Sequence, residues 1–351
     1  MKKEHLKWVL GVLLLGALVL GCAQPQAPKE TTTPQATATT PSLPPGTVLK
    51  VGGGPVGGLW YPAASLYAQL ITDNTPYKAT PTVGGGEENV RKIVNNQLDL
   101  AITFSLPTYQ AYNGKGNFDK PYKNIRTIAA VYPSPLQVAV LADSDIHSYS
   151  DLLGKRVSPG KVGFTGKYTF EKVLEVYGIS LDDIEKAGGK ITYAGYRDQV
   201  DLMKDGHLDA IVQQTVVPSS TLLDLSTLKP IRLLSIDQDK LEEFLKRNPA
   251  YSAYEIPANV YNGQTEPVQS VGLWNIWVCR ADLPEDVVYK ITKILWDNQE
   301  KFYELHQAYR DNMKLENALK GLTVPLHPGA YKFYKEKGLE IPDNLVPPEY
   351  R

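Results

Sequence analysis

Two long apolar runs with β character constrain the fold of this chain more than any other feature. They cover residues 136–141 and 271–279. Each follows a block in which short β-rich runs alternate with helical runs, a pattern typical of α/β layers. A chain that leaves one α/β block along a long strand and returns along another forms two lobes joined by two crossover strands. The sequence therefore predicts a two-lobed α/β fold with a cleft, followed by a C-terminal helical segment.

The expected boundaries follow from these two runs. Residues 47–141 together with 272–351 are predicted to form lobe I, and residues 142–271 lobe II. The pattern predicts strands over 48–52, 77–83, 98–103, 127–131 and 136–141 in the first block. It predicts one helix over 299–310 in the C-terminal segment. Open α/β sheets bind ligands at the carboxyl ends of their strands. Two such sheets facing each other predict a cleft that closes on a ligand.

The N-terminus has the pattern of an export signal. Lysines precede the uncharged run 8–20, and Gly21 comes directly before Cys22. This arrangement resembles a bacterial lipobox, so residues 1–21 are predicted to be a signal peptide and Cys22 a lipidated N-terminus. An ordinary signal peptide with a chance cysteine is the alternative. Residues 22–46, rich in Thr and Pro, predict a flexible linker. We therefore expect an extracytoplasmic protein anchored at a membrane surface.

Composition excludes several classes of protein. The chain has 37 basic and 38 acidic residues, so it lacks the positive surplus of nucleic-acid-binding proteins. Of its two cysteines, Cys279 lies in an apolar run and is expected to be a buried, unreactive side chain. The five histidines are scattered, and no catalytic triad spacing is present. The prediction is a monomeric binding protein without metal, cofactor or enzymatic activity.

A glycine-rich segment joins the first predicted strand to the first predicted helix, Gly52-Gly53-Gly54-Pro55-Val56-Gly57-Gly58. It contains G-x-G-x-x-G, but nicotinamide cofactors are scarce outside the cytoplasm and Pro55 removes one N–H group. A glycine-rich loop at a helix N-terminus presents N–H groups to an anion. Gly54 and Gly57 are therefore candidate ligand contacts, and a tight turn without a ligand is the alternative.

Similar turns recur further along the chain. Gly84-Gly85-Gly86 follows the second predicted strand, so Gly86 and Asn89 are candidates in the first turn of the next helix. Polar residues at other predicted strand ends or helix starts complete the candidate set, namely Ser105, Thr165, Gln213, Gln214 and Thr215. For the last three, an exposed polar loop is the alternative.

Several segments together resemble the TAXI receptors, the solute-binding subunits of one class of TRAP transporter. The segments are Gly53-Gly54-Pro55-Val56-Gly57-Gly58-Leu59-Trp60-Tyr61-Pro62, Asp151-Leu152-Leu153-Gly154-Lys155-Arg156-Val157, Asp205-Gly206-His207-Leu208-Asp209-Ala210 and Pro325-Leu326-His327-Pro328-Gly329-Ala330. The resemblance implies a periplasmic-binding-protein fold of type II character. It also implies delivery of a glutamate-like or dicarboxylate solute to membrane subunits driven by an ion gradient, with ligand contacts from the glycine loop, Tyr61 and Asn89.

The chain departs from the family pattern at three places. The family often has Ser at the position of Gly86 and Asp at the position of Leu106, and Phe164 interrupts its Gly-Ser-Gly-Thr motif. These changes remove polar groups and add an aromatic ring. We therefore expect a small carboxylate, an organic or amino acid, with a less polar body than glutamate. A sensory or ABC-type binding lipoprotein with the same cleft is the alternative function.

Overall fold

The structure is a computed structural model that describes residues 42–54, 59–162 and 164–351. The predicted lipidation site Cys22 and the candidate Gly57 lie outside these residues. Within them, no helix is both long and apolar enough to span a bilayer.

The strands form one open, mixed sheet with the order β2-β1-β3-β10-β4-β7-β5-β6, in which β8 also pairs with β4 and β9 with β10. Two groups of three parallel strands lie on opposite sides of the pair β4 and β10. One group consists of β2, β1 and β3, and the other of β7, β5 and β6. The strands are β1 (Val48–Gly52), β2 (Lys78–Thr82), β3 (Leu100–Phe104), β4 (Ile125–Leu141), β5 (Arg156–Ser158), β6 (Lys190–Ile191), β7 (Ala210–Gln214), β8 (Ile231–Leu233), β9 (Ser252–Ile256) and β10 (Val268–Arg280).

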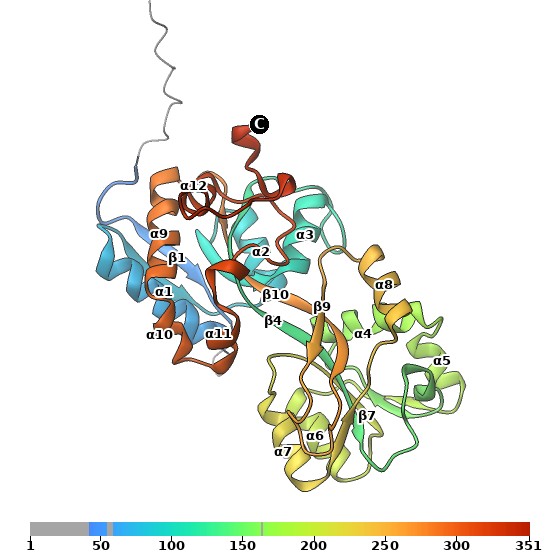
Figure 1. The fold of residues 1–351 in the computed structure, drawn as a ribbon. Coiled ribbons are helices and arrows are strands. Elements are labelled where there is room, and N and C mark those ends of the chain that lie inside the picture. The colour runs from blue at the N-terminus through green and yellow to red at the C-terminus, as the bar shows by residue number, and fades with distance from the viewer. Residues whose placement is uncertain (1–41, 55–58, 163) are drawn as a thin grey trace, which may run out of the picture. The chain divides into compact units, whose positions relative to one another are not determined.

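Strands β4 and β10 connect the two lobes. They pair antiparallel and run from one lobe to the other (Figure 1), and both are almost entirely buried. The first part of β4 lies beside β10, whereas its last residues pair with β7 and β8 of lobe II. The two-lobed α/β fold with two crossover strands expected from the sequence is thereby confirmed.

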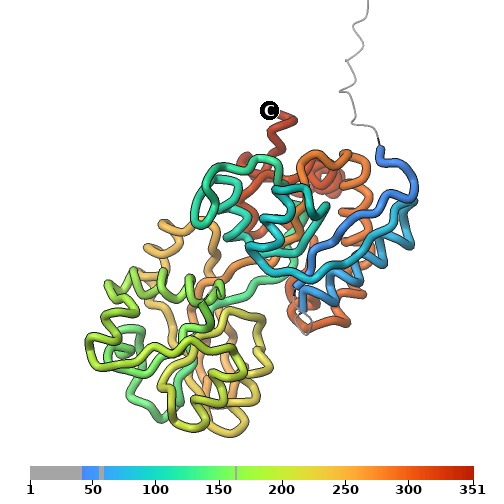
Figure 2. Tube along the Cα trace, turned by 180° about the vertical axis from the view of Figure 1, so that it is seen from behind, coloured from blue at the N-terminus to red at the C-terminus, as the bar shows by residue number. Residues whose placement is uncertain are grey.

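Helices connect successive strands and cover the sheet. They are α1 (Trp60–Asn74), α2 (Gly86–Val94), α3 (Ser105–Asn113), α4 (Thr165–Val176), α5 (Leu181–Lys186), α6 (Tyr196–Lys204), α7 (Ser220–Leu228), α8 (Gln238–Arg247), α9 (Glu285–Asp297), α10 (Gln299–Tyr303), α11 (Gln307–Asn312) and α12 (Pro328–Glu336). The chain start and the C-terminal helices belong to the same lobe, where the blue and the orange-to-red segments lie side by side (Figure 2). The Tyr67 hydroxyl on α1 fixes this contact, because it donates to the Ile291 carbonyl of α9 at 2.9 Å.

Three apolar clusters make the core. The first fills lobe I, and it includes Cys279, which is fully buried as the sequence predicts. Burial raises the pKa of the Cys279 thiol, so the side chain is not a reactive thiolate. The other two clusters consist mainly of lobe II residues, together with residues from the lobe II ends of β4 and β10. Leu106 of α3 belongs to the second of them, although α3 follows a lobe I strand.

The structure differs from the sequence prediction at three places in lobe I. The runs 127–131 and 136–141 form one strand, β4, because the prolines between them still pair in the ladder, Pro133 with Trp274 and Pro135 with Gly272. The helix expected over 299–310 is two helices. Helix α10 ends at Tyr303 with Glu304 as its C-cap, and His306 caps α11, since its Nδ1 accepts the Ala308 N–H at 3.0 Å. Helix α3, absent from the sequence prediction, begins at Ser105 and ends at the left-handed Gly114.

Candidate functional site

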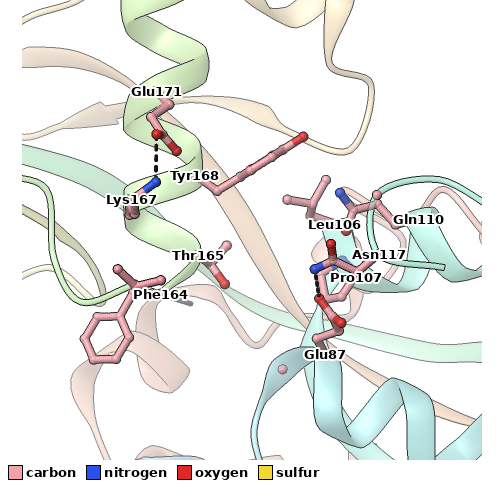
Figure 3. Close-up of a pocket in the computed structure, with 13 residues that line it drawn as sticks. Glu87, Leu106, Pro107, Gln110, Asn117, Phe164, Thr165, Lys167, Tyr168 and Glu171 are labelled. Carbon is pink, nitrogen blue, oxygen red and sulfur yellow. Dashed lines mark hydrogen bonds and ion pairs between the residues drawn. The ribbon is translucent and has the colours of Figure 1, made fainter. Parts of the chain in front are cut away.

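A cavity of about 290 Å³ separates α2 and α3 from the first turns of α4 (Figure 3). We call it the front compartment. It is lined by Gly86, Glu87, Leu106, Pro107, Gln110, Gly116, Asn117, Val162, Phe164, Thr165, Lys167, Tyr168 and Glu171. Its size suits a small molecule. Its lining comes from both lobes, so a ligand held there contacts both.

Three helices begin at the front compartment. Helix α2 starts at Gly86, α3 at Ser105 and α4 at Thr165, and none has a side-chain hydrogen bond at its N-cap. The first N–H groups of a helix lack partners within the helix and favour negative or hydrogen-bond-accepting groups. Glu87 and Glu88 already offset this effect at α2, whereas the first turn of α4 has no acidic residue. The starts of α3 and α4 therefore present N–H groups that no acidic residue of their own first turn offsets.

The charged side chains of the front compartment are paired on their own lobes. The Glu87 carboxylate accepts from the Arg91 guanidinium at 2.8 Å and from the Asn117 amide at 3.0 Å. On the other wall, the Lys167 ammonium donates to Glu171 at 2.7 Å (Figure 3). The lining thus holds two carboxylates against one ammonium group.

Apolar side chains also line this space, although the Phe164 ring points away from α3 (Figure 3) and packs edge to face on Tyr196, with the ring centroids 5.5 Å apart. On α4 and the segment before it, Phe164 is 38% and Tyr168 40% exposed, a large exposure for aromatic rings. Leu106 and Pro107 of α3 lie on the opposite wall, and Tyr168 extends toward Leu106 and Gln110 (Figure 3). Behind Gly86, Trp60 and Phe104 pack edge to face with their centroids 4.8 Å apart. An apolar ligand body would find contacts on both walls.

A second cavity, of about 280 Å³, adjoins the first. We call it the side compartment. Its lining comes from α3 with the loop after it, from α4, and from the end of α8 with the loop toward β9. It is lined by Leu106, Tyr109, Gln110, Lys115, Gly116, Tyr168, Arg247, Asn248, Pro249, Ala250 and Tyr251. Four residues line both compartments, which makes one continuous cleft of two parts: Leu106, Gln110, Gly116 and Tyr168.

Only some of the sequence-predicted residues line this cleft. Gly86 and Thr165 line the front compartment. Tyr61 and Gly54 line neither compartment. Tyr61 is in the first turn of α1, and buried Gly54 packs against Trp60, where an added Cβ would be 2.9 Å from the Trp60 Cβ. Ser105 is fully buried, and its hydroxyl donates to the Ala250 carbonyl at 2.9 Å, so it joins α3 to lobe II.

Asn89 is fully buried beside the glycine-rich turns. Its amide nitrogen donates to the Gly53 carbonyl at 2.7 Å and to the Ile102 carbonyl at 2.8 Å. Its Oδ1 atom has no hydrogen-bond partner among the described residues. The structure therefore shows Asn89 joining the ends of β1 and β3, a supporting role that the sequence did not predict. A direct contact with ligand stays a prediction.

Gln199 of α6 occupies the corresponding place in lobe II. Its amide nitrogen donates to the Ser158 carbonyl at 2.9 Å and to the Val212 carbonyl at 3.1 Å, so it joins β5 to β7. Its Oε1 atom likewise has no partner in the described part of the chain. Each lobe thus uses one buried amide, on the helix after its second parallel strand, to join two parallel strands.

The polar residues at the end of β7 are held by neighbours in the protein. Gln213 accepts from the hydroxyls of Ser219 and Thr221, which positions the start of α7. Gln214 accepts from the Thr169 hydroxyl at 2.6 Å and donates to the Ser134 carbonyl at 3.3 Å. Thr215 is partly buried, and its N–H donates to the Pro135 carbonyl. None of the three lines either compartment.

The sequence missed most of the residues that line the cleft. Leu106 and Phe164 were marked only as departures from a family pattern. Nothing in the sequence indicated that the cleft is also lined by Tyr168, Gln110, Lys115 and Arg247, because an aromatic or charged residue on a helix is normally a surface or packing residue. These residues come together in one cleft only through the three-dimensional fold, in which helix α3, not predicted from the sequence, forms one wall.

The described residues form a two-lobed α/β fold with two crossover strands. The chain belongs to the NMT1-like family, whose profile matches residues 51–338.

Three solved structures illustrate the similarity. The alkanesulfonate-binding protein SsuA of Xanthomonas axonopodis pv. citri, bound to MOPS, is 15% identical, with a TM-score of 0.42 over 75% of this chain and 79% of that one. PhnD1 of Prochlorococcus marinus, in complex with methylphosphonate, is 16% identical, with a TM-score of 0.46 over 75% and 91%. The probable amino-acid ABC transporter extracellular-binding protein ytmK of Bacillus subtilis is 15% identical, with a TM-score of 0.43 over 77% and 100%.

Proposed function

We propose that this protein is an extracytoplasmic solute-binding protein that captures a small carboxylate, an organic or amino acid, in the cleft between its lobes. The observation that carries the proposal is the front compartment. It is lined from both lobes, it lies at the start of three uncapped helices, and aromatic rings are exposed in it. Its lining suits the capture of a ligand, and we assign it no catalytic step.

The ligand body is proposed to be apolar or aromatic. Gly86, Leu106 and Phe164, the three places where the sequence departs from the TAXI pattern, all line the front compartment. A Cβ atom added at Gly86 would be at ordinary contact distance from the rings of Phe104 and Trp60. Because glycine has no such atom, this space beside the two rings is open to a ligand. Together these residues favour a body less polar than glutamate.

We propose that the two lobes, residues 47–141 with 272–351 and residues 142–271, close on the ligand about β4 and β10. Delivery to TRAP membrane subunits is the proposal that the TAXI resemblance supports. Delivery to an ABC transporter is the alternative, since ytmK is described as an ABC transporter protein. Ligand uptake by cells carrying the candidate membrane subunits separates the two: a TRAP system needs an ion gradient, and an ABC system needs ATP.

A lipid anchor at Cys22 is the proposed membrane attachment. Changing Cys22 to Ser should move the protein from the membrane fraction to the soluble fraction, or leave the precursor uncut, because the thiol that accepts the lipid is absent. Fractionation followed by mass spectrometry of the mature N-terminus measures this. Unchanged membrane retention and processing of the Cys22→Ser protein would refute the anchor.

A thermal-shift screen tests the proposed ligand class. The panel contains carboxylates, sugars and polyamines at matched ionic strength. We expect one or more carboxylates to stabilise the protein, since a ligand at about 100 times its Kd raises the free energy of unfolding by about 2.7 kcal/mol. Hits confined to sugars or polyamines would contradict the proposal.

A further inference from the structure

We infer that the anionic group of the ligand lies in the side compartment, between Lys115 and Arg247, while its apolar body fills the front compartment. The inference rests on the proposed function and specifies it further. It assigns the ligand to amphipathic acids, in which a carboxylate is attached to an aryl or alkyl body.

The charges of the two compartments differ in sign. The front compartment is lined by Glu87 and Glu171 but by only one basic side chain, Lys167. The side compartment is lined by Lys115 and Arg247 and by no acidic side chain. An anion is repelled by negative and attracted by positive side chains. The difference in electrostatic energy between the two compartments grows when closure of the lobes removes water. A carboxylate is therefore more favourably placed in the side compartment.

Both cations keep hydrogen-bond donors for a ligand. The Lys115 ammonium donates to the Tyr109 hydroxyl at 3.1 Å and lies 5.2 Å from the centre of that ring. An ammonium has three donors, so this contact holds it in place without using all of them. The Arg247 guanidinium pairs with Glu243 one turn back on α8. A guanidinium has five N–H groups, and its planar shape matches a carboxylate.

Tyr168 lies at the junction of the two compartments. It lines both, as does Leu106 on the opposite wall. Figure 3 shows the Tyr168 ring extending from α4 toward Leu106 and Gln110. A flat or narrow body could lie between the ring and Leu106, with its acidic end beyond them. The loop on the far side is fixed, because the Tyr251 hydroxyl is 3.0 Å from the Thr169 hydroxyl.

The test is calorimetric titration of the protein that begins at Cys22, after the predicted signal peptide. The probes are 3-phenylpropionate and hexanoate, each compared with its neutral amide. We expect both acids to bind, and each amide to bind at least about ten-fold more weakly. Lys115→Gln and Arg247→Gln should each weaken binding of the acids about ten-fold and the double variant about a hundred-fold, since a charge-assisted contact is lost each time.

The controls are neighbouring exposed lysines outside the lining, Lys120→Gln on the same loop and Lys246→Gln on the same helix. Their affinities should equal that of the unaltered protein, and Lys115→Arg should retain most of the affinity. Thermal unfolding of each variant confirms that it is folded.

The outcomes separate the two proposals. Binding of the acids that is unchanged by both charge substitutions, or equal binding of acids and amides, would overturn the side-compartment inference and leave the proposed function standing. Failure of both acids to bind, while another carboxylate from the screen binds, would also overturn the inference alone. If no carboxylate binds, both the side-compartment inference and the proposed function are refuted.

Discussion

Replacing Asn89 with Ala should lower the free energy of unfolding by about 2–4 kcal/mol, a large effect for one polar side chain. The amide nitrogen of Asn89 satisfies the Gly53 and Ile102 carbonyls, and the side chain is fully buried. Its removal leaves both acceptors without this donor in a place that water does not reach, and each loss costs about 1–3 kcal/mol. Urea unfolding followed by circular dichroism measures the change.

Two further variants make this prediction specific. Gln199→Ala should cost a similar amount, since that amide bonds the Ser158 and Val212 carbonyls in the other lobe. Asn74→Ala removes an exposed amide that donates to the Leu70 carbonyl, and it should change stability by less than about 1 kcal/mol. Equal effects of Asn89→Ala and Asn74→Ala would show that the buried amide does not join β1 to β3 in solution.

Acid should destabilise the protein through His327. This side chain caps α12: its Nδ1 accepts the Gly329 N–H at 3.1 Å, and its Nε2 donates to the Leu283 carbonyl at 2.9 Å. The pKa of His327 is lowered from an ordinary value near 6.5 to about 3, mainly by burial; the hydrogen bond to the Leu283 carbonyl opposes this shift and the nearby Arg126 cation adds to it. The imidazole therefore stays neutral in the folded protein over most of the acidic range.

The direction of the effect follows from the two pKa values. Between pH 6.5 and about 3, the unfolded chain binds a proton at this histidine and the folded protein does not. The contribution of His327 to stability is complete above pH 6.5 and is lost as the pH falls through this window. The loss approaches about 1.4 kcal/mol for each pH unit well below pH 6.5.

Comparison of pH profiles isolates this residue from the carboxylates that also titrate in acid. His327→Asn keeps an N-cap acceptor without a group that titrates, so its unfolding free energy should fall less steeply between pH 6.5 and 5. The exposed His207→Asn should keep the slope of the unaltered protein. The same slope in all three proteins would refute the assignment.

The fold was largely predictable because its strongest signals are local. The β4 and β10 segments contain long apolar β runs, and the alternation of strands and helices specifies the α/β layers. The missed helix α3 shows the limit of such signals. Its sequence has little apolar periodicity, and it is stabilised by contacts from the other lobe, in which Leu106 joins a lobe II cluster and Ser105 bonds Ala250.

The candidate site was less predictable than the fold. Gly86 and Thr165, both candidates from glycine-rich turns, lie at the starts of α2 and α4 and line the cleft, and a ligand contact at either stays a prediction. The same reasoning cannot distinguish a polar side chain that faces the cleft from one that supports it, as Asn89 does. The side compartment could not be predicted from the sequence, because Lys115 and Arg247 are far apart in the chain. They line the same cavity only because α3 packs against lobe II.

Calorimetric titration of the strongest carboxylate from the screen into two variants tests directly whether the cleft holds a small carboxylate. Thr165→Trp places an indole at the start of α4, in the front compartment, whereas Thr227→Trp places one on an exposed position of α7. We expect Thr165→Trp to abolish binding while the protein stays folded, and Thr227→Trp to bind as the unaltered protein does. Undiminished binding by a folded Thr165→Trp protein would contradict this expectation.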